Sequence, residues 1–110
     1  MKPKAFAIDV GLDFSRTPSG RFHSDGDSSA EAFFIHTLDD LLSEGYCVNL
    51  EFHNVLQAGS SFLYHLTGLL VSYGYDSRIN ITKDDKWEYT KWRWDKYIKQ
   101  HKDKEVDKYE

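Results

Sequence analysis

Apolar and polar residues alternate along three short segments of the chain, at residues 5–10, 46–52 and 78–82. This alternation predicts β-strands, because successive side chains of a strand point to opposite faces of its sheet. Each segment has one apolar face and one mixed face, whereas strands buried on both faces are apolar throughout. We therefore expect a sheet that helices cover mainly on one side.

Apolar residues recur at helical spacing between the predicted strands, over residues 34–42 and 62–73. Gly45 and Gly74 follow these segments and are expected to end the two helices. Helices that connect strands in this way indicate crossover connections and parallel strand pairing. The sequence therefore predicts an α/β domain with a mixed, mostly parallel sheet of about four strands and with helices on one face.

The segment at residues 11–27 is rich in turn-forming residues. Residues 21–23 within it are expected to form a short extra strand. Ser28 and Glu31 have the spacing of a capping box, so Ser28 is expected to be the N-cap of the first helix.

A long C-terminal helix is expected to begin around residue 84 or 85 and to fray from about residue 102. A narrow apolar stripe of this helix is expected to seal the sheet, and its members are Trp87, Trp94 and Ile98. Residues 1–82 are thus expected to form the core of the domain. Residues 83–110 are expected to form the C-terminal helix and a charged tail that pack on the same domain.

Composition narrows the class of protein. The chain has 110 residues, of which 40 % are hydrophobic and 15 % aromatic, enough for one domain with a core. Its net charge of -4 weighs against a general nucleic-acid binder. Cys47 is the single cysteine, which excludes an internal disulfide and fits a reducing compartment. No apolar run approaches the roughly 18 residues that span a bilayer, so we expect a cytoplasmic protein without membrane contact.

The start of the second predicted helix carries the most informative motif, Gly59-Ser60-Ser61-Phe62. A helix start leaves backbone N–H groups without partners and carries partial positive charge. The two serine hydroxyls have two uses at such a place. They cap the helix, which stabilises it by roughly 0.5–2 kcal/mol, or they present an oxygen to phosphate chemistry as a phosphorylation switch.

Two motifs carry a resemblance to a known family. The first comprises Gly20-Arg21-Phe22, Asp25-Gly26, Ser28, Glu31 and Phe33, and the second Gly59-Ser60-Ser61-Phe62-Leu63, Gly68 and Leu69. Over about residues 5–82 the chain resembles the prokaryotic STAS-like domain family of unknown function. It departs from that family at Ala30, where glycine is common, and at Tyr64 and His65, where acidic residues are common.

The resemblance implies a STAS fold and a role as a binding and switching module. In the anti-sigma-factor antagonists of this fold, a partner kinase phosphorylates a Ser or Thr at the start of the second helix. Ser61 matches that position best, with Ser60 beside it. The implied function is a non-catalytic regulatory module with a protein partner such as a kinase-like ATPase. The oligomeric state stays open, with a dimer among the options.

The expected partner-binding surface combines the start of the second helix with the loop at residues 20–27 and with aromatic residues of the tail. Its members are Gly59, Ser60, Ser61, Phe62, Tyr64, His65, Arg21, Asp25, Tyr89 and Trp92. Arg21 and Glu31 are expected either to form an ion pair that holds the loop or to bind a ligand carboxylate or phosphate.

Two other classes of function stay open at this point. Ser61 with His65 or His53 as its base would make a small hydrolase or transferase. Tyr89 and Trp92 would stack on bases in an accessory nucleic-acid binder. The five histidines lack the spacing of a zinc protease, and we expect neither a metal nor a cofactor.

Overall fold

The three alternating segments form the strands of one sheet. The computed structural model describes residues 4–82 and 88–108, of which Tyr89 and residues 104–108 by their backbone alone. The strands are β1 (Ala5–Asp9), β2 (Cys47–Glu51) and β3 (Ile79–Ile81), in the order β1-β2-β3. Both strand pairings are parallel, as the helices between the strands predicted.

The register of the sheet gathers apolar side chains on one face. Ile8 of β1 lies opposite Leu50 of β2, which lies opposite Ile81 of β3, and all three are buried. One position earlier in each strand, side chains point to the other face and are more accessible; these are Ala7, Asn49 and Asn80. The predicted difference between the two faces is therefore present.

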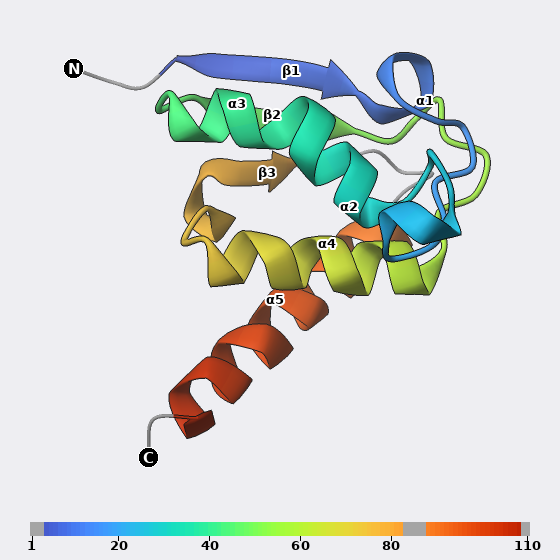
Figure 1. Cartoon of the computed structure of the whole chain (residues 1–110). Helices are drawn as coiled ribbons and strands as arrows, with labels where there is room; N and C mark the ends of the chain where they lie inside the picture. Colours follow the sequence, from blue (N-terminus) through green and yellow to red (C-terminus); the bar gives the residue numbers. More distant parts are fainter. Residues whose placement is uncertain (1–3, 83–87, 109–110) are drawn as a thin grey trace.

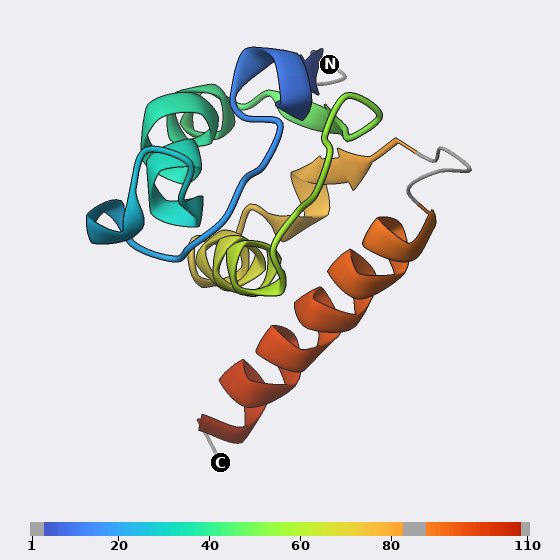
Figure 2. The same ribbon diagram turned by 90° about the vertical axis from the view of Figure 1, so that its right-hand side faces the viewer.

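Five α-helices accompany the sheet in the described part of the chain. They are α1 (Val10–Asp13), α2 (Ala30–Phe33), α3 (Asp39–Ser43), α4 (Ser60–Ser72) and α5 (Glu88–Lys108). A π-helical segment, Phe34–Leu38, joins α2 to α3 without a break. Figures 1 and 2 show α2, α3 and α4 along one side of the sheet, with α5 crossing beside α4.

Glycines end the first two predicted helical regions. Gly45 follows α3 with φ 97° and Gly74 follows α4 with φ 74°. A positive φ of this size costs glycine little and strains other residues. The predicted ends of both helices are therefore confirmed.

The start of α2 differs from the predicted capping box. Ser29, and not Ser28, is the N-cap, and its hydroxyl accepts a hydrogen bond from the Ala32 N–H at 3.2 Å. Ser28 instead lies 3.1 Å from the Ser15 hydroxyl. Glu31, the expected second member of the box, accepts from the backbone N–H of a residue in the preceding loop.

The expected extra strand at residues 21–23 does not form. This segment bends into a 3-10 turn at His23–Asp25. The Asp25 carboxylate accepts hydrogen bonds from the N–H groups of Arg21, at 3.0 Å, and Phe22, at 2.9 Å. These donors are consequently used within the turn and cannot join a strand ladder, and the described residues form three strands instead of about four.

The C-terminal helix α5 contributes to the core, as predicted for its apolar stripe. Trp94 is 3 % exposed and belongs to the same buried cluster as the strand residues, and Ile98 packs against that cluster. Trp87, the third member of the stripe, lies outside the described residues. The side chain of Lys102 forms an ion pair with Asp76 at 2.8 Å, so α5 is tied to the turn that follows α4.

The length of α5 also exceeds the expectation. Its backbone is helical to Lys108, whereas fraying was expected from about residue 102. No helix in the described part of the chain is both long enough and apolar enough to cross a membrane.

Candidate functional site

The first turn of α4 presents two serine hydroxyls at the surface. Gly59 is the N-cap, in an extended conformation with φ -67° and ψ 143°, and no side chain caps the helix. Ser60 and Ser61 are the first two residues of α4 and both are exposed. Of the two predicted uses of these hydroxyls, helix capping is therefore wrong.

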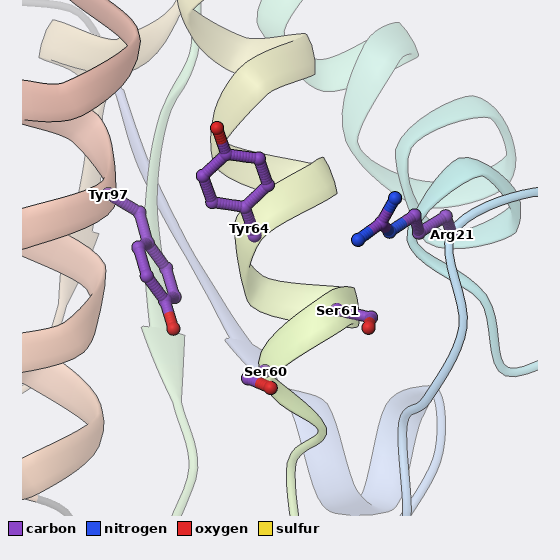
Figure 3. A pocket seen from close by; sticks show the side chains of 5 residues that line it. All are labelled: Arg21, Ser60, Ser61, Tyr64 and Tyr97. Carbon is purple, nitrogen blue, oxygen red and sulfur yellow. The ribbon is translucent and has the colours of Figure 1, made fainter.

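An open cavity of about 280 Å³ lies beside this turn, between three separate parts of the chain. Its lining residues are Arg21, Ser60, Ser61, Tyr64 and Tyr97. Figure 3 shows Ser61 on the side of α4 that faces Arg21, with Tyr97 approaching from α5. A guanidinium is always charged, and the start of a helix is partially positive. The cavity therefore has the electrostatic character that suits an anionic group.

The loop that carries Arg21 is held by backbone contacts. The Glu31 N–H donates to the Arg21 carbonyl at 2.9 Å, and the Asp25 carboxylate closes the turn. Backbone hydrogen bonds from Phe22 and Arg21 lower the pKa of Asp25 below its ordinary value, so this carboxylate remains ionised. The expected ion pair between Arg21 and Glu31 does not form, because the Glu31 carboxylate is engaged by His23.

His65 lies one turn into α4 and packs against the same loop. Its ring meets the Phe22 ring edge-on, with the ring centroids 4.9 Å apart. Burial lowers the pKa of His65 below 6.5, in spite of the opposing charge of Glu31. The imidazole is therefore mostly uncharged at neutral pH.

His53, the other base considered for Ser61, has a different partner. Its Nε2 lies 3.5 Å from an Asp9 carboxylate oxygen, and the Asn54 amide donates to the same oxygen at 2.6 Å. Within the described part of the chain, neither His53 nor His65 is hydrogen-bonded to Ser61. A nucleophile with its base in place is thus not assembled at this turn.

Aromatic residues of α5 complete the far wall of the cavity. The Tyr97 ring contacts the Tyr64 ring edge-on, with centroids 5.3 Å apart. His101 lies 4.4 Å from the Tyr64 ring between centroids, and its Nε2 is 2.8 Å from the Tyr64 carbonyl oxygen. The position of Tyr64 is consequently set by α5 as well as by α4.

The remaining predicted contact residues divide between core and surface. Phe62 is fully buried, so its side chain belongs to the core and its assignment to the contact surface is corrected. Trp92 is 56 % exposed, and the Lys96 ammonium lies 5.1 Å from the centroid of its ring. The side chain of Tyr89 lies outside the described residues.

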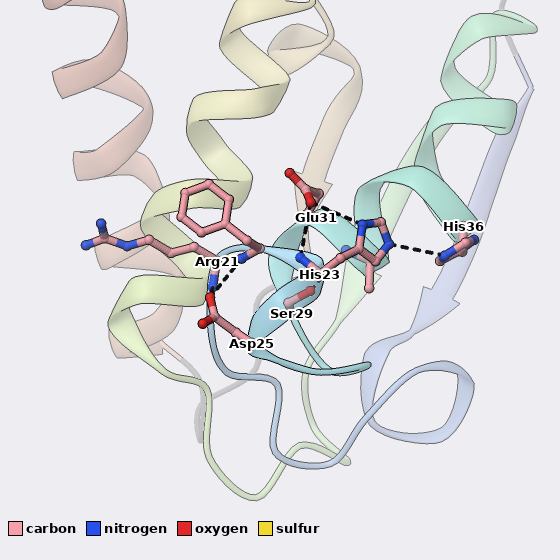
Figure 4. A network of polar contacts seen from close by, with 8 residues as sticks. Arg21, His23, Asp25, Ser29, Glu31 and His36 are labelled. Atoms are coloured by element: carbon pink, nitrogen blue, oxygen red, sulfur yellow. Dashed lines mark hydrogen bonds and ion pairs between the residues drawn. The ribbon is translucent and has the colours of Figure 1, made fainter.

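A polar network that sequence reasoning missed lies behind the Arg21 loop (Figure 4). One Glu31 oxygen, Oε1, is 3.1 Å from both the backbone nitrogen and the Nδ1 of His23. The Nε2 of His23 is 3.3 Å from the Nε2 of His36, which lies on the π-helical segment. The backbone N–H of His23 is the main cause of a lowered pKa at Glu31. The two histidines are 13 positions apart, so no local spacing rule brings them together.

Comparison of the chain with family models, curated proteins and solved structures finds no match. The resemblance to the STAS-like family therefore stays a prediction from two motifs. Function has to be argued from the geometry and chemistry of the site.

Proposed function

We propose that this protein is a non-catalytic regulatory module that binds a protein partner through the first turn of α4. In this proposal, phosphorylation of Ser61, or of Ser60 beside it, switches the binding. One observation carries the proposal: two exposed serine hydroxyls, neither used as a helix cap, share a cavity with the Arg21 guanidinium. The STAS resemblance suggests a kinase-like ATPase as the partner, and such ATP-dependent chemistry belongs in the cytoplasm.

The electrostatics of the turn support a switch that leaves the fold intact. A phosphate adds about -1.5 to -2 charges. The α4 start and Arg21 would both attract those charges, so the folded state would tolerate the modification. A partner that docks on the unmodified turn would meet a strongly charged surface instead.

The aromatic wall of the cavity supports a protein as the partner. Tyr64 and Tyr97 line the same cavity as the serines, and tyrosine is enriched among the residues that dominate binding energy at protein interfaces. No histidine is hydrogen-bonded to Ser61 in the described part of the chain, so the proposal assigns this serine no catalytic role.

The test compares Ser61→Ala and Ser61→Asp with the unsubstituted protein. Each form is used to capture partners from a lysate of the host cell, and the captured proteins are quantified by mass spectrometry. We expect a kinase-like protein whose capture differs several-fold between the Ala and Asp variants. The same cells should yield phosphorylated peptide containing Ser60 and Ser61. Ser61→Asp should unfold within about 1 kcal/mol of the unsubstituted protein, because an acid in the first helical turn is favourable.

Ser77→Asp is the matched control, since Ser77 is an exposed serine in the turn after α4 and lies outside the cavity lining. It should capture the same proteins as the unsubstituted chain. Identical capture by all four forms, together with unphosphorylated peptide, would contradict the proposal. Covalent labelling of Ser61 by a fluorophosphonate would instead favour a hydrolase.

A further inference from the structure

The histidine pair behind the Arg21 loop brings two ring nitrogens close together. The Nε2 atoms of His23 and His36 are 3.3 Å apart, and their ring planes meet at 69°. Figure 4 shows the two nitrogens facing each other between the loop and the helix. Zinc–imidazole bonds are about 2.0–2.1 Å long in tetrahedral sites, which places two nitrogens on one ion about 3.3–3.4 Å apart. The observed separation therefore matches a pair of ligands on one tetrahedral metal ion.

A direct hydrogen bond between the two rings is the competing interpretation. It requires that one Nε2 carries a proton and the other a lone pair. The usual length of a hydrogen bond donated by N–H is about 2.7–3.2 Å. The observed 3.3 Å lies at the long end of hydrogen-bonding distances and also equals the separation of two ligands on one ion. The same arrangement of the rings therefore suits both, and metal titration distinguishes them.

Glu31 prepares His23 for metal binding. An ionised carboxylate only accepts hydrogen bonds, so its contact with Nδ1 at 3.1 Å means that Nδ1 carries the proton. In the neutral imidazole the lone pair of His23 is then on Nε2, the atom that faces His36. A carboxylate that orients a metal-binding imidazole from its other nitrogen is a recurrent arrangement in zinc proteins.

The backbone on both sides of the pair is held in place. The loop that carries His23 is closed by the Asp25 carboxylate and by the backbone hydrogen bond from Glu31 to Arg21. His36 lies on the π-helical segment between α2 and α3, and such segments occur frequently at functional sites. Ligands on supported elements are held at the spacing that a metal ion needs.

We propose that His23 and His36 bind one divalent transition-metal ion of the Zn²⁺ class through their Nε2 atoms, with Glu31 as the orienting carboxylate. No group of three or more His, Cys, Asp or Glu side chains in the described part of the chain is arranged to hold a metal. Water therefore fills the remaining coordination positions. The His23 side chain is 44 % exposed, so a metal ion and its water ligands can both reach the two histidines. This site is independent of the proposed serine switch.

The direct test is calorimetric titration of the untagged full chain with ZnCl₂. We expect one Zn²⁺ per chain in the unsubstituted protein. His23→Asn and His36→Asn should each abolish this saturable binding, and Glu31→Gln should weaken it by roughly 10–100-fold. His53→Asn is the matched control and should leave the affinity unchanged, because His53 is paired with Asp9 elsewhere.

A second measurement protects the test against variants that fail to fold. Nitrogen NMR of the imidazoles in the unsubstituted protein should show Zn²⁺-dependent shifts at Nε2 of His23 and His36, with little change at His53. Absence of Zn²⁺ binding overturns the proposal. Binding that survives both asparagine substitutions, or Zn²⁺-dependent shifts confined to other histidines, overturns it as well.

Discussion

Asp9 is the last residue of β1 and the N-cap of α1, and its carboxylate has several partners there. It accepts the Leu12 N–H at 3.0 Å and the Asn54 amide at 2.6 Å, and His53 lies 3.5 Å away. Burial alone would raise the pKa of Asp9, but these hydrogen bonds and the charge of His53 together lower it below 3.8. The folded protein thus holds this carboxylate ionised to a lower pH than the unfolded chain does.

The sign of the resulting pH dependence follows from linkage. Below about pH 3.9, the ordinary aspartate pKa, the unfolded chain binds a proton that the folded protein resists. The stabilisation by Asp9 is therefore complete above that pH and is lost as the pH falls through the folded pKa. Asp9→Asn keeps a capping side chain but removes the titration. Urea unfolding at several pH values should show a shallower loss of stability in this variant between about pH 5 and 2.

Asp103→Asn is the control for this prediction. Asp103 is exposed on α5, and its carboxylate accepts no hydrogen bond from the described residues. The variant should follow the unsubstituted protein over the whole pH range. An Asp9→Asn variant with the same acid limb as the unsubstituted protein would show that Asp9 contributes nothing to the pH dependence.

Single side-chain contacts were the part of the structure that sequence reasoning predicted least well. The capping-box rule considers residues three apart, and it selected Ser28 where Ser29 caps. Glu31 pairs with His23 eight positions earlier, because the intervening turn folds the loop back onto the helix. Ser61 was expected on a contact surface, and it is exposed. Arg21 was expected on the same surface as Ser61, and both line one cavity, but the alternative of an ion pair with Glu31 was wrong because Glu31 pairs with His23.

Strands and helices were easier to predict than side-chain contacts. Burial of one face repeats apolar residues with a period of 2 in a strand and 3.6 in a helix. Val48 and Leu50 are fully buried, while the alternate residues of β2, Cys47, Asn49 and Glu51, are half-buried. The sequence alternates in the same way, so it predicts β2 as a strand with one covered face. The short α1 lacks such a period and went unpredicted. The π-helical segment lies within the helix predicted at residues 34–42, but its π-type geometry was not predicted.

The contact between α4 and α5 joins residues far apart in the sequence, so rules based on local spacing did not predict it. Gly68 lies at this contact. A Cβ atom added at Gly68 would lie 3.1 Å from the nearest atom of the His101 ring. That ring in turn contacts Tyr64. Glycine in the middle of α4 therefore permits the close approach of α5, at a cost to the intrinsic stability of the helix.

The balance between these two effects gives a quantitative prediction. Alanine is favoured over glycine in a helix interior by about 0.8–1 kcal/mol. In a His101→Ala background, Gly68→Ala should therefore stabilise the protein by about that amount. In the unsubstituted protein the crowded ring should reduce or reverse the gain. A double-mutant cycle of denaturant unfolding measures the difference, and equal effects in both backgrounds would rule out the proposed crowding.

At the scale of the whole molecule, one buried cluster links the sheet to all the longer helices. Trp94 of α5 belongs to the same cluster as Leu50 of β2 and Phe62 of α4. The predicted division into a core at residues 1–82 and a packed tail thus describes two parts that share apolar surface. We expect them to unfold together.

Two tryptophans of α5 test this expectation, because they lie two positions apart and differ in burial. Trp94 is 3 % exposed and Trp92 is 56 % exposed. Trp94→Ala should lower the free energy of unfolding by about 3–5 kcal/mol, as for other large buried aromatics. Trp92→Ala should lower it by about 1 kcal/mol or less, because more than half of this side chain is exposed and its contact with Lys96 lies at the surface.

The unfolding curve itself distinguishes a shared core from an appended helix. If α5 is part of the core, tryptophan fluorescence and far-ultraviolet circular dichroism should report one coincident transition in the unsubstituted protein. A helix that only rests on the domain would instead melt first, and Trp94→Ala would then leave the main transition in place. The second pattern would mean that Tyr97 leaves the serine cavity before the domain unfolds, so the cavity would persist only while α5 is docked.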